Sequence, residues 1–336
     1  ILSSVATGTI ITMSSFHWLL AWIGLELNTL AIIPIIAKQH HPRATEATTK
    51  YFLTQAAASA MILFASTTNA WFSGTWDISQ LTNPTSCTML TLALAMKLGL
   101  APLHFWLPEV LQGTSLKTAL IIATWQKLAP ITLLYLTHNS INPTPMLVMA
   151  LLSTLTGGWG GLNQTQTRKI LAFSSIAHLG WMASIITLNP NVLLLNLSLY
   201  ILMTTPMFLL LKITTSKTIK DLTTTWTTTP QMTVLIMLLL MSLGGLPPLT
   251  GFMPKWLILQ ELTTHNLTTA ATIMAMSALL SLFFYLRLAY VTTLTMYPTT
   301  TKTPNKWRFQ PKNLTTPIST LSTLSVLLLP TTPMLF

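Results

Sequence analysis

An apolar run over residues 87–111 cannot form one straight helix, because helix-breaking residues and a charge interrupt it at Met96-Lys97-Leu98-Gly99-Leu100-Ala101-Pro102-Leu103-His104-Phe105-Trp106-Leu107-Pro108-Glu109. Proline removes a backbone donor, and its ring clashes with the preceding helical turn. Pro102 and Pro108 therefore predict a break within the run, and Gly99 lies just before it. Lys97 adds a positive charge next to this break. The run predicts a discontinuous helix that carries a lysine.

The composition of the whole chain indicates what surrounds such runs. Of its 336 residues, 51% are hydrophobic and only 7% are charged, and the mean hydropathy is +0.61. Soluble domains carry roughly 25% charged residues, so lipid must be the solvent for most of this surface. The net charge of +11 is spread over short clusters between apolar runs, which is not the single basic patch of a nucleic-acid-binding protein. Cys87 is the one cysteine, which excludes an intrachain disulfide, a CxxC zinc site and a cysteine set for an iron–sulfur cluster.

A membrane-spanning helix needs about 20 mostly apolar residues, and by this rule about eleven segments qualify. They lie at residues 1–13, 16–37, 48–71, 87–111, 116–137, 145–161, 170–188, 192–213, 232–261, 268–297 and 318–336. The chain is therefore predicted to be an all-α polytopic membrane protein.

The connections between these segments alternate in charge. Even-numbered connections collect the basic residues Lys38, Arg43, Lys50, Arg168, Lys169, Lys212, Lys217, Lys220, Lys302, Lys306, Arg308 and Lys312. Odd-numbered connections offer almost none, with Asp77, His138, Glu261 and His265 as their ionisable residues. Lysine and arginine collect on the side from which helices are inserted. We expect the N-terminus and the basic loops to face that side.

A second interrupted run lies in residues 232–261. It reads Gly244-Gly245-Leu246-Pro247-Pro248-Leu249-Thr250-Gly251 and is followed by Pro254 and Lys255. If segments one to five and six to ten form two repeats, the interrupted runs are the fourth helix of each. Paired interrupted helices point to the site of a transporter, because unwound backbone at membrane depth needs a cavity or protein around it. Simple proline kinks would explain neither the matching positions nor the lysines.

Four charges lie in these apolar segments, at Glu26, Lys97, Lys127 and Lys255. A charge at mid-membrane costs roughly 2.5–3.5 kcal/mol even on a lenient scale, so each needs a reason. One acid among three lysines predicts a pair between Glu26 and Lys97. A buried lysine shifts its proton affinity readily and can load and release a proton. The alternatives are lysines that extend to the membrane surface and a purely structural ion pair.

His178 lies in the seventh segment, in the place of the second repeat that Glu26 occupies in the first. Its unperturbed pKa near 6.5 suits a proton relay. A hydrogen-bonded structural histidine is the competing interpretation. His104 and Glu109 lie near the first break, and the sequence leaves open whether they face a cavity or the surface.

Several long strings now carry a resemblance to a known family. They are the stretch from Met96 to Glu109, then Gly157-Gly158-Trp159-Gly160-Gly161-Leu162-Asn163-Gln164-Thr165-Gln166, Ser174-Ser175-Ile176-Ala177-His178, and Ser242 to Phe252. The chain resembles, over nearly its whole length, the antiporter-like membrane subunits of mitochondrial NADH:ubiquinone oxidoreductase (respiratory complex I), in the vertebrate chain 2 branch. That resemblance implies inverted five-helix repeats, here residues 1–137 and 138–297, with residues 298–336 forming a connecting loop and a C-terminal membrane helix.

The same resemblance implies a function and a setting. It implies proton translocation from the mitochondrial matrix to the intermembrane space, with Glu26 and Lys97 as the coupling pair, Lys127 as the central relay and Lys255 towards the far half-channel. It implies no cofactor in this chain, while the whole complex uses NADH, flavin, iron–sulfur clusters and ubiquinone. The implied partners are other membrane subunits, including antiporter-like neighbours, and phospholipids, with the basic loops in the matrix at the inner membrane.

Two other functions fit the charge pattern. A stand-alone cation/proton antiporter would need the same buried charges, and the lack of a large soluble part and the family strings favour a subunit over it. A structural membrane scaffold predicts that apolar residues can replace the buried lysines without loss of function.

Overall fold

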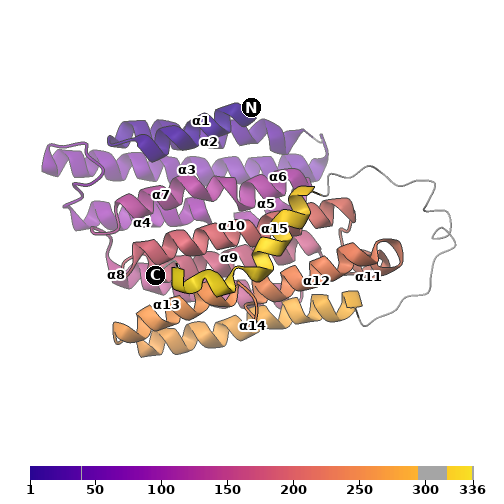
Figure 1. Cartoon of the computed structure of the whole chain (residues 1–336). Coiled ribbons are helices and arrows are strands. Elements are labelled where there is room, and N and C mark those ends of the chain that lie inside the picture. Colours follow the sequence, from indigo (N-terminus) through magenta and orange to yellow (C-terminus); the bar gives the residue numbers. More distant parts are fainter. Residues whose placement is uncertain (39, 294–315, 335–336) are drawn as a thin grey trace.

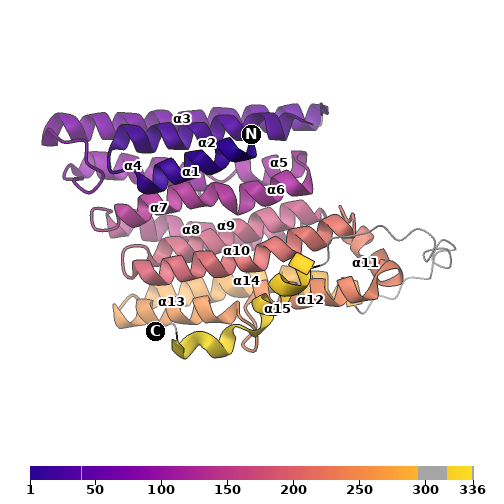
Figure 2. The ribbon, with the colours of Figure 1, turned by 45° about the horizontal axis from the view of Figure 1, so that its top comes forward.

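The structure is a computed structural model that describes residues 1–38, 40–293 and 316–334 (Figure 1). Its regular elements are helices, and most of them run nearly parallel in one elongated bundle (Figures 1 and 2). One edge of the bundle holds α1 (Leu2–Ser14), α2 (Trp18–Ala37) and α3 (Pro42–Ser73). The opposite edge holds α12 (Pro230–Gly244), α13 (Phe252–Thr264) and α14 (Thr268–Thr293).

The middle of the bundle joins these edges. It contains α4 (Pro84–Leu98), α5 (Trp106–Gly113), α6 (Leu116–Ala123), α7 (Leu128–Leu136), α8 (Pro143–Leu162), α9 (Thr167–Ile185) and α10 (Pro190–Ile213), while α11 (Ile219–Thr228) lies at one end. Many of these helices begin with proline, whose missing donor costs nothing in a first turn. Asn83 and Asn189 accept hydrogen bonds at the starts of α4 and α10, as N-cap residues do.

The membrane-spanning character of the chain is clearest in five helices. In the described part of the chain, Trp18–Ala37, Leu116–Leu136, Pro143–Leu162, Pro190–Ile213 and Thr268–Thr293 are long and apolar enough to cross a membrane. The expected segments at 87–111 and 232–261 are each divided into two helices. The expected segment at 48–71 belongs to a longer helix, because α3 already begins at Pro42. The first turns of α3 carry Arg43, Glu46 and Lys50. Residues 294–297 of the tenth segment lie outside the described residues, as do Lys302, Lys306, Arg308 and Lys312.

Both predicted helix breaks are present and are built alike. The helices α4 and α12 each have 15 residues, start at a proline and end at a glycine in the left-handed region, Gly99 with φ 81° and Gly245 with φ 78°. The N–H of each glycine donates to two carbonyls of the last turn, and the next N–H donates to the first of these two. Glycine is favoured at such a cap because it has no Cβ to clash. The chain resumes as α5 and α13, in which Pro108 and Pro254 are the third residues.

A third break, which the sequence interpretation missed, divides the expected segment 116–137. Between α6 and α7 the chain forms a 3₁₀ turn, η1 (Trp125–Lys127). The N–H of Lys127 donates to Thr124 O at 3.3 Å instead of to Ala123 O, which an α-helix would use. Pro130 explains the position of the break, because it cannot donate to the carbonyl of Gln126 and its ring crowds that turn. Lys127 therefore lies at a break and not within a regular helix.

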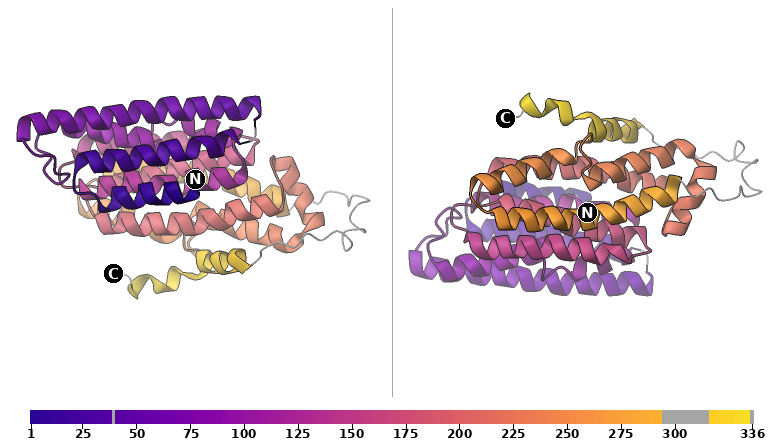
Figure 3. Two further views of the ribbon diagram at one scale, coloured as in Figure 1. Left: turned by 90° about the horizontal axis from the view of Figure 1, so that it is seen from above. Right: turned by 90° about the horizontal axis from the view of Figure 1, so that it is seen from below.

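The expected single C-terminal membrane helix over 318–336 is not formed. The helix α15 (Thr316–Leu327) has 12 residues, fewer than the about 20 that a spanning helix needs, and continues as the 3₁₀ helix η3 (Leu329–Met334). Pro330 ends the α-helical pattern because it cannot donate to the preceding turn. The helix α15 lies at the periphery of the bundle (Figure 3). It packs against α10 and α12, and Thr250 of the second break donates a hydrogen bond to Ser325 O.

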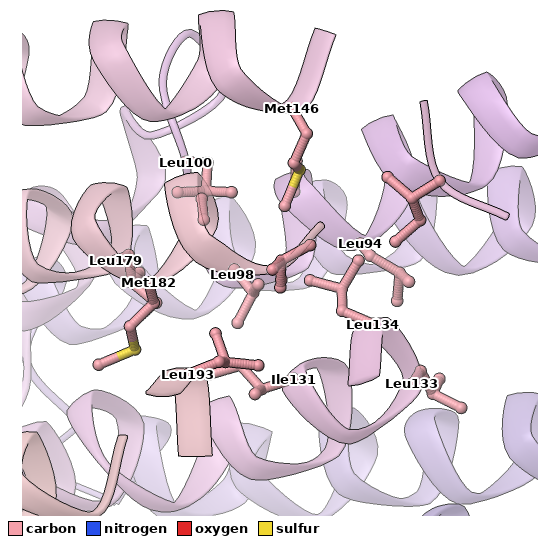
Figure 4. Close-up of a cluster of buried hydrophobic side chains, with 14 of the residues drawn as sticks. Leu94, Leu98, Leu100, Ile131, Leu133, Leu134, Met146, Leu179, Met182 and Leu193 are labelled. Atoms are coloured by element: carbon pink, nitrogen blue, oxygen red, sulfur yellow. The ribbon is translucent and has the colours of Figure 1, made fainter. Parts of the chain in front are cut away.

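Close packing holds the bundle together, since lipid is as apolar as the side chains and hydrophobic burial between helices adds little. Leucine, isoleucine and methionine side chains of α4, α7, α8, α9 and α10 form one cluster where the two halves of the chain meet (Figure 4). Small residues bring α8 and α9 together. A Cβ on Gly157 would lie 2.6 Å from Ala177 N, and one on Gly180 would lie 2.2 Å from Ser153 Oγ.

Candidate functional site: charges at three helix breaks

Lys97 lies in the last turn of α4, two residues before the Gly99 cap, and is only 6% exposed. Within the described part of the chain its Nζ has no hydrogen-bond partner. Glu26, on α2, is half-buried, and its Oε2 is likewise unpartnered. The two groups interact electrostatically, but no salt bridge joins them among the described residues. The fold thus brings the predicted pair within electrostatic range without direct contact.

Two buried amides, which the sequence interpretation missed, lie beside Lys97. Asn28 on α2 and Gln55 on α3 are 2% and 4% exposed, and both carry side-chain atoms without a hydrogen-bond partner in the described structure. With Lys97 and Gln126 they line a cavity of about 10 Å³. That volume matches roughly one water molecule. The signal in the sequence was an amide within each apolar segment, which a search restricted to charges passes over.

Lys127 lies at the third break and is 2% exposed. Its Nζ donates to the hydroxyl of Tyr200 at 3.1 Å and lies 4.6 Å from the centroid of the Tyr200 ring. The Tyr200 hydroxyl in turn donates to Ala123 O at 3.1 Å. Gln126, Ala129 and Pro130, which flank Lys127, also line the small cavity next to Lys97. The first and third breaks therefore share one polar region in the bundle.

His178 lies on α9 between two of the lysines. It is 6% exposed, and its ring centroid is 5.5 Å from that of Tyr200. It interacts electrostatically with both Lys127 and Lys255. Sequence reasoning placed His178 in the same position of its repeat as Glu26, and the fold puts it in electrostatic range of one lysine from each half of the chain.

Lys255 lies in the first turn of α13, at the second break. Its Nζ donates to Gly244 O at 2.7 Å, so the ammonium closes over the C-terminal end of α12. A positive charge is stabilised there by the helix dipole. A Cβ on Gly245 would lie 2.9 Å from this Nζ, which is a second reason for glycine at the cap. The side chain is partly buried, and its ammonium turns to the protein backbone.

Glu109 belongs to a different cluster, at the end of the bundle. It contacts Lys50 at 2.5 Å, and Lys50 also pairs with Glu46. The hydrogen bond and charge of Lys50 hold the pKa of Glu46 below its usual value. These residues line an open cavity of about 240 Å³ together with Arg43 and Lys169. The basic residues of two even-numbered connections thus meet at one end of the bundle. His104 lies elsewhere: it is buried in the first break and packs on Phe105, with 4.4 Å between the ring centroids.

The buried charges are distributed across the bundle. Glu26, Lys97, Lys127, His178 and Lys255 lie on α2, α4, η1, α9 and α13, elements that are spread from one edge of the bundle to the other (Figures 1 and 2). No group of three or more histidine, cysteine, aspartate or glutamate side chains that could hold a metal ion occurs among the described residues. The lysines at the helix breaks are groups that can each gain or lose a proton.

Comparisons with known proteins identify the family of the chain. A family model for the transmembrane region of NADH:quinone oxidoreductase and Mrp antiporters matches residues 15–281, and a model for the NADH dehydrogenase subunit 2 C-terminus matches residues 282–336. NADH-ubiquinone oxidoreductase chain 2 of Salmo salar is 62% identical over 333 residues, which cover 99% of this chain and 95% of the relative. The same protein of Xenopus laevis is 58% identical over 334 residues, which cover 99% and 97%.

Solved structures extend the likeness to the fold. A chain of respiratory complex I from Thermus thermophilus superposes with a TM-score of 0.87 at 26% identity, covering 97% of this chain and 76% of that one. A chain of the Mrp complex from Dietzia has a TM-score of 0.85 at 18% identity, covering 99% and 74%, and is similar in fold. The chain therefore belongs to the NADH:quinone oxidoreductase/Mrp antiporter transmembrane family, in the branch of the vertebrate NADH-ubiquinone oxidoreductase chain 2 proteins.

Proposed function

We propose that this chain is a non-redox membrane subunit of respiratory complex I that moves protons from the mitochondrial matrix to the intermembrane space. NADH oxidation by ubiquinone in other subunits drives the movement, and the flavin, iron–sulfur clusters and quinone site belong to those subunits. Family membership and the names of the vertebrate relatives support the setting. The observation that carries the proposal is that Lys97, Lys127 and Lys255 each lie at a helix break within an apolar segment, since only a function justifies such costly groups in a membrane.

The proposed route has four stages. Glu26 and Lys97 form the coupling pair, because they interact electrostatically without the salt bridge that would hold both in one state. Lys127 is the central relay, and the shared cavity supports its link to Lys97. His178 relays the change in protonation of Lys127 to Lys255 in the second half of the chain. Its electrostatic interaction with both lysines supports this role. Lys255 is the lysine towards the far half-channel.

The proposed architecture has about ten spans, five in each repeat, since the expected eleventh span over 318–336 is divided into α15 and η3. Two inverted five-helix repeats, residues 1–137 and 138–297, are followed by a C-terminal segment over 298–336. The two breaks with the same proline start, helix length and glycine cap support the repeats. In the inner mitochondrial membrane the N-terminus and basic loops face the matrix, supported by the meeting of Arg43, Lys50 and Lys169 at one end. The partners are other membrane subunits, including antiporter-like chains, and phospholipids.

Lys127→Met tests the proposal, because methionine keeps most of the side-chain volume and removes the proton-carrying group. We expect an assembled complex in which coupled proton pumping falls to background, with NADH oxidation reduced alongside if the two are tightly coupled. Proton uptake and NADH oxidation are measured in parallel in the same membranes, and the amount of assembled complex is the control. Pumping at the wild-type rate in an assembled variant would exclude the relay.

A stand-alone antiporter makes a different prediction in the same membranes. It would exchange cations for protons without NADH oxidation. An ion gradient applied in the absence of NADH therefore separates the two functions: we expect no proton flux through this chain under those conditions.

A further inference from the structure

Tyr200 contacts both the Lys127 ammonium and the His178 ring. It lies on α10, is 1% exposed, and its hydroxyl contacts Lys127, Ala123 and the Ser175 side chain. The hydroxyl accepts a hydrogen bond from Lys127 Nζ at 3.1 Å and donates one to Ala123 O at 3.1 Å. Its ring lies under the Lys127 ammonium at 4.6 Å and beside the His178 ring at 5.5 Å.

We propose that Tyr200 is a positioning residue for Lys127, which holds the ammonium at the break between α6 and α7 and connects it to the half of the bundle that carries His178. This inference rests on the proposed function, because it assumes that Lys127 exchanges protons. It adds a residue that bears no charge and that the charge pattern alone does not indicate.

The helix break creates the acceptor that orients Tyr200. The N–H of Lys127 donates to Thr124 O, so Ala123 O lacks the donor it would have in a continuous α-helix. A buried carbonyl without a partner costs free energy, and the Tyr200 hydroxyl supplies the missing donor. The tyrosine therefore docks on the break itself.

This docking decides how Tyr200 meets Lys127. A phenol has a single hydrogen to donate, and here that hydrogen goes to Ala123 O. Only the acceptor lone pairs of the oxygen remain for Lys127 Nζ. An acceptor held in place favours the ammonium form of the lysine over the amine, and the ring face attracts the same charge. Tyr200 therefore fixes both the position of Lys127 and its preference for a proton.

Tyr200 also crosses the boundary between the proposed repeats. Lys127 precedes residue 138, whereas Tyr200 and His178 follow it, on α10 and α9. The titratable groups that face this region are Tyr200 from α10, His178 from α9 and Tyr285 from α14, with Lys255 in electrostatic range of His178. On the opposite side, Lys97 lies across the cavity shared with Gln126. A change in the proton on Lys127 is thus transmitted to His178 through one side chain.

Tyr200→Phe tests the inference, because it keeps the ring and removes only the hydroxyl. In membranes whose assembled complex carries the variant, we expect coupled proton pumping per complex to fall on the order of tenfold, the loss typical of one hydrogen bond to a charged group. We also expect the alkaline side of the pH profile to move to lower pH, since the ammonium loses its acceptor. Tyr135→Phe is the matched control, because it removes a hydroxyl from a partly buried tyrosine on α7, and we expect wild-type behaviour.

Three outcomes would overturn the inference. Wild-type pumping and an unchanged pH profile in Tyr200→Phe would mean that the hydroxyl does not position Lys127. A lower rate with an unchanged pH profile, after normalisation to assembled complex, would mean that Tyr200 only satisfies the Ala123 carbonyl. An equal loss of pumping and an equal shift of the pH profile in Tyr135→Phe would mean that the effect is not specific to the hydroxyl of Tyr200. Lys127→Met distinguishes failure of this inference from failure of the proposed function. If Lys127→Met abolishes pumping while Tyr200→Phe behaves as wild type, the inference fails and the proposed function stands.

Discussion

The two broken helices share a backbone and differ in where the lysine enters. In the α4–α5 break, Lys97 comes from the last turn of the first helix and its Nζ is unpartnered in the described structure. In the α12–α13 break, Lys255 comes from the first turn of the second helix and its Nζ is tied to Gly244 O. Counted from the two cap glycines, Leu243 takes the place of Lys97, and Glu109 the place of Lys255.

This difference shows that the structure of the helix break does not determine the position of its lysine. A proline-rich break after a glycine cap opens the helix, and either side of the opening can present a lysine. Lys97 interacts with Glu26 without a salt bridge, so its environment can change with that acid. Lys255 is held by a fixed carbonyl, which suits a group with a steadier charge. Lys97 is thus the responsive member and Lys255 the anchored one.

The largest expected effect comes from Gly251, where the two breaks differ most in space. A Cβ on Gly251 would lie 1.7 Å from Ser242 O, whereas the matching residue of the first break, Phe105, is 71% exposed. Gly251→Ala forces backbone apart and should cost about 3 kcal/mol or more, enough to prevent assembly. Native gel electrophoresis of the complex measures this. Phe105→Ala is the control, and we expect it to assemble; comparable assembly of both variants would mean that the second break is not tightly packed.

The next effect distinguishes the two lysines. Lys97→Met leaves the half-buried Glu26 without the cation in its electrostatic range, and we expect coupled pumping to fall roughly a hundredfold. Lys255→Met leaves one carbonyl without a donor, and we expect a loss of about tenfold. Proton pumping per assembled complex is measured for both variants. Equal losses would contradict the distinction between a responsive and an anchored lysine.

The smallest effect should come from Glu109, although it occupies the place of Lys255. Glu109→Gln removes one of two carboxylates from an exposed lysine, and such surface pairs contribute little to stability because water screens them. We expect wild-type pumping and a small, salt-sensitive drop in thermal stability. Because Lys50 lowers the pKa of Glu46, the contribution of this cluster should be present at neutral pH and be lost as the pH falls through the pKa of Glu46 in the folded state. A thermal-shift series in salt and pH measures it, and a large loss of pumping would place Glu109 on the route after all.

Much of the fold was predictable because helix breaks are local. Glycine and proline act within one or two turns, so Gly99 with Pro102 and Gly245 with Pro248 indicated both discontinuous helices. The break at Lys127 was missed because Pro130 lies only three residues beyond it, within an otherwise apolar segment. The C-terminal prediction was wrong for a similar reason: hydropathy suggested one span over 318–336, whereas α15 ends at Leu327.

The candidate site was predictable only as a set of residues. The cost of charge in lipid singles out Glu26, Lys97, Lys127 and Lys255 without any structure. Uncharged members such as Asn28, Gln55 and Tyr200 carry no such signal, because the cost of burying a charge does not apply to them. Their membership depends on which helices pack together.

The sequence by itself determined the membrane class, the places where helices break and which charges must be protected, since hydropathy, backbone sterics and desolvation act on each residue and its close neighbours. Only the tertiary structure decided that Glu26 and Lys97 stand in range without contact, that Glu109 joins a surface cluster, and that Tyr200 meets Lys127. Lys127 and Tyr200 are 73 positions apart in the chain, and the 3.1 Å between their polar atoms depends on how α10 packs against the break. No local preference encodes such a distance, because packing of the whole bundle sets it.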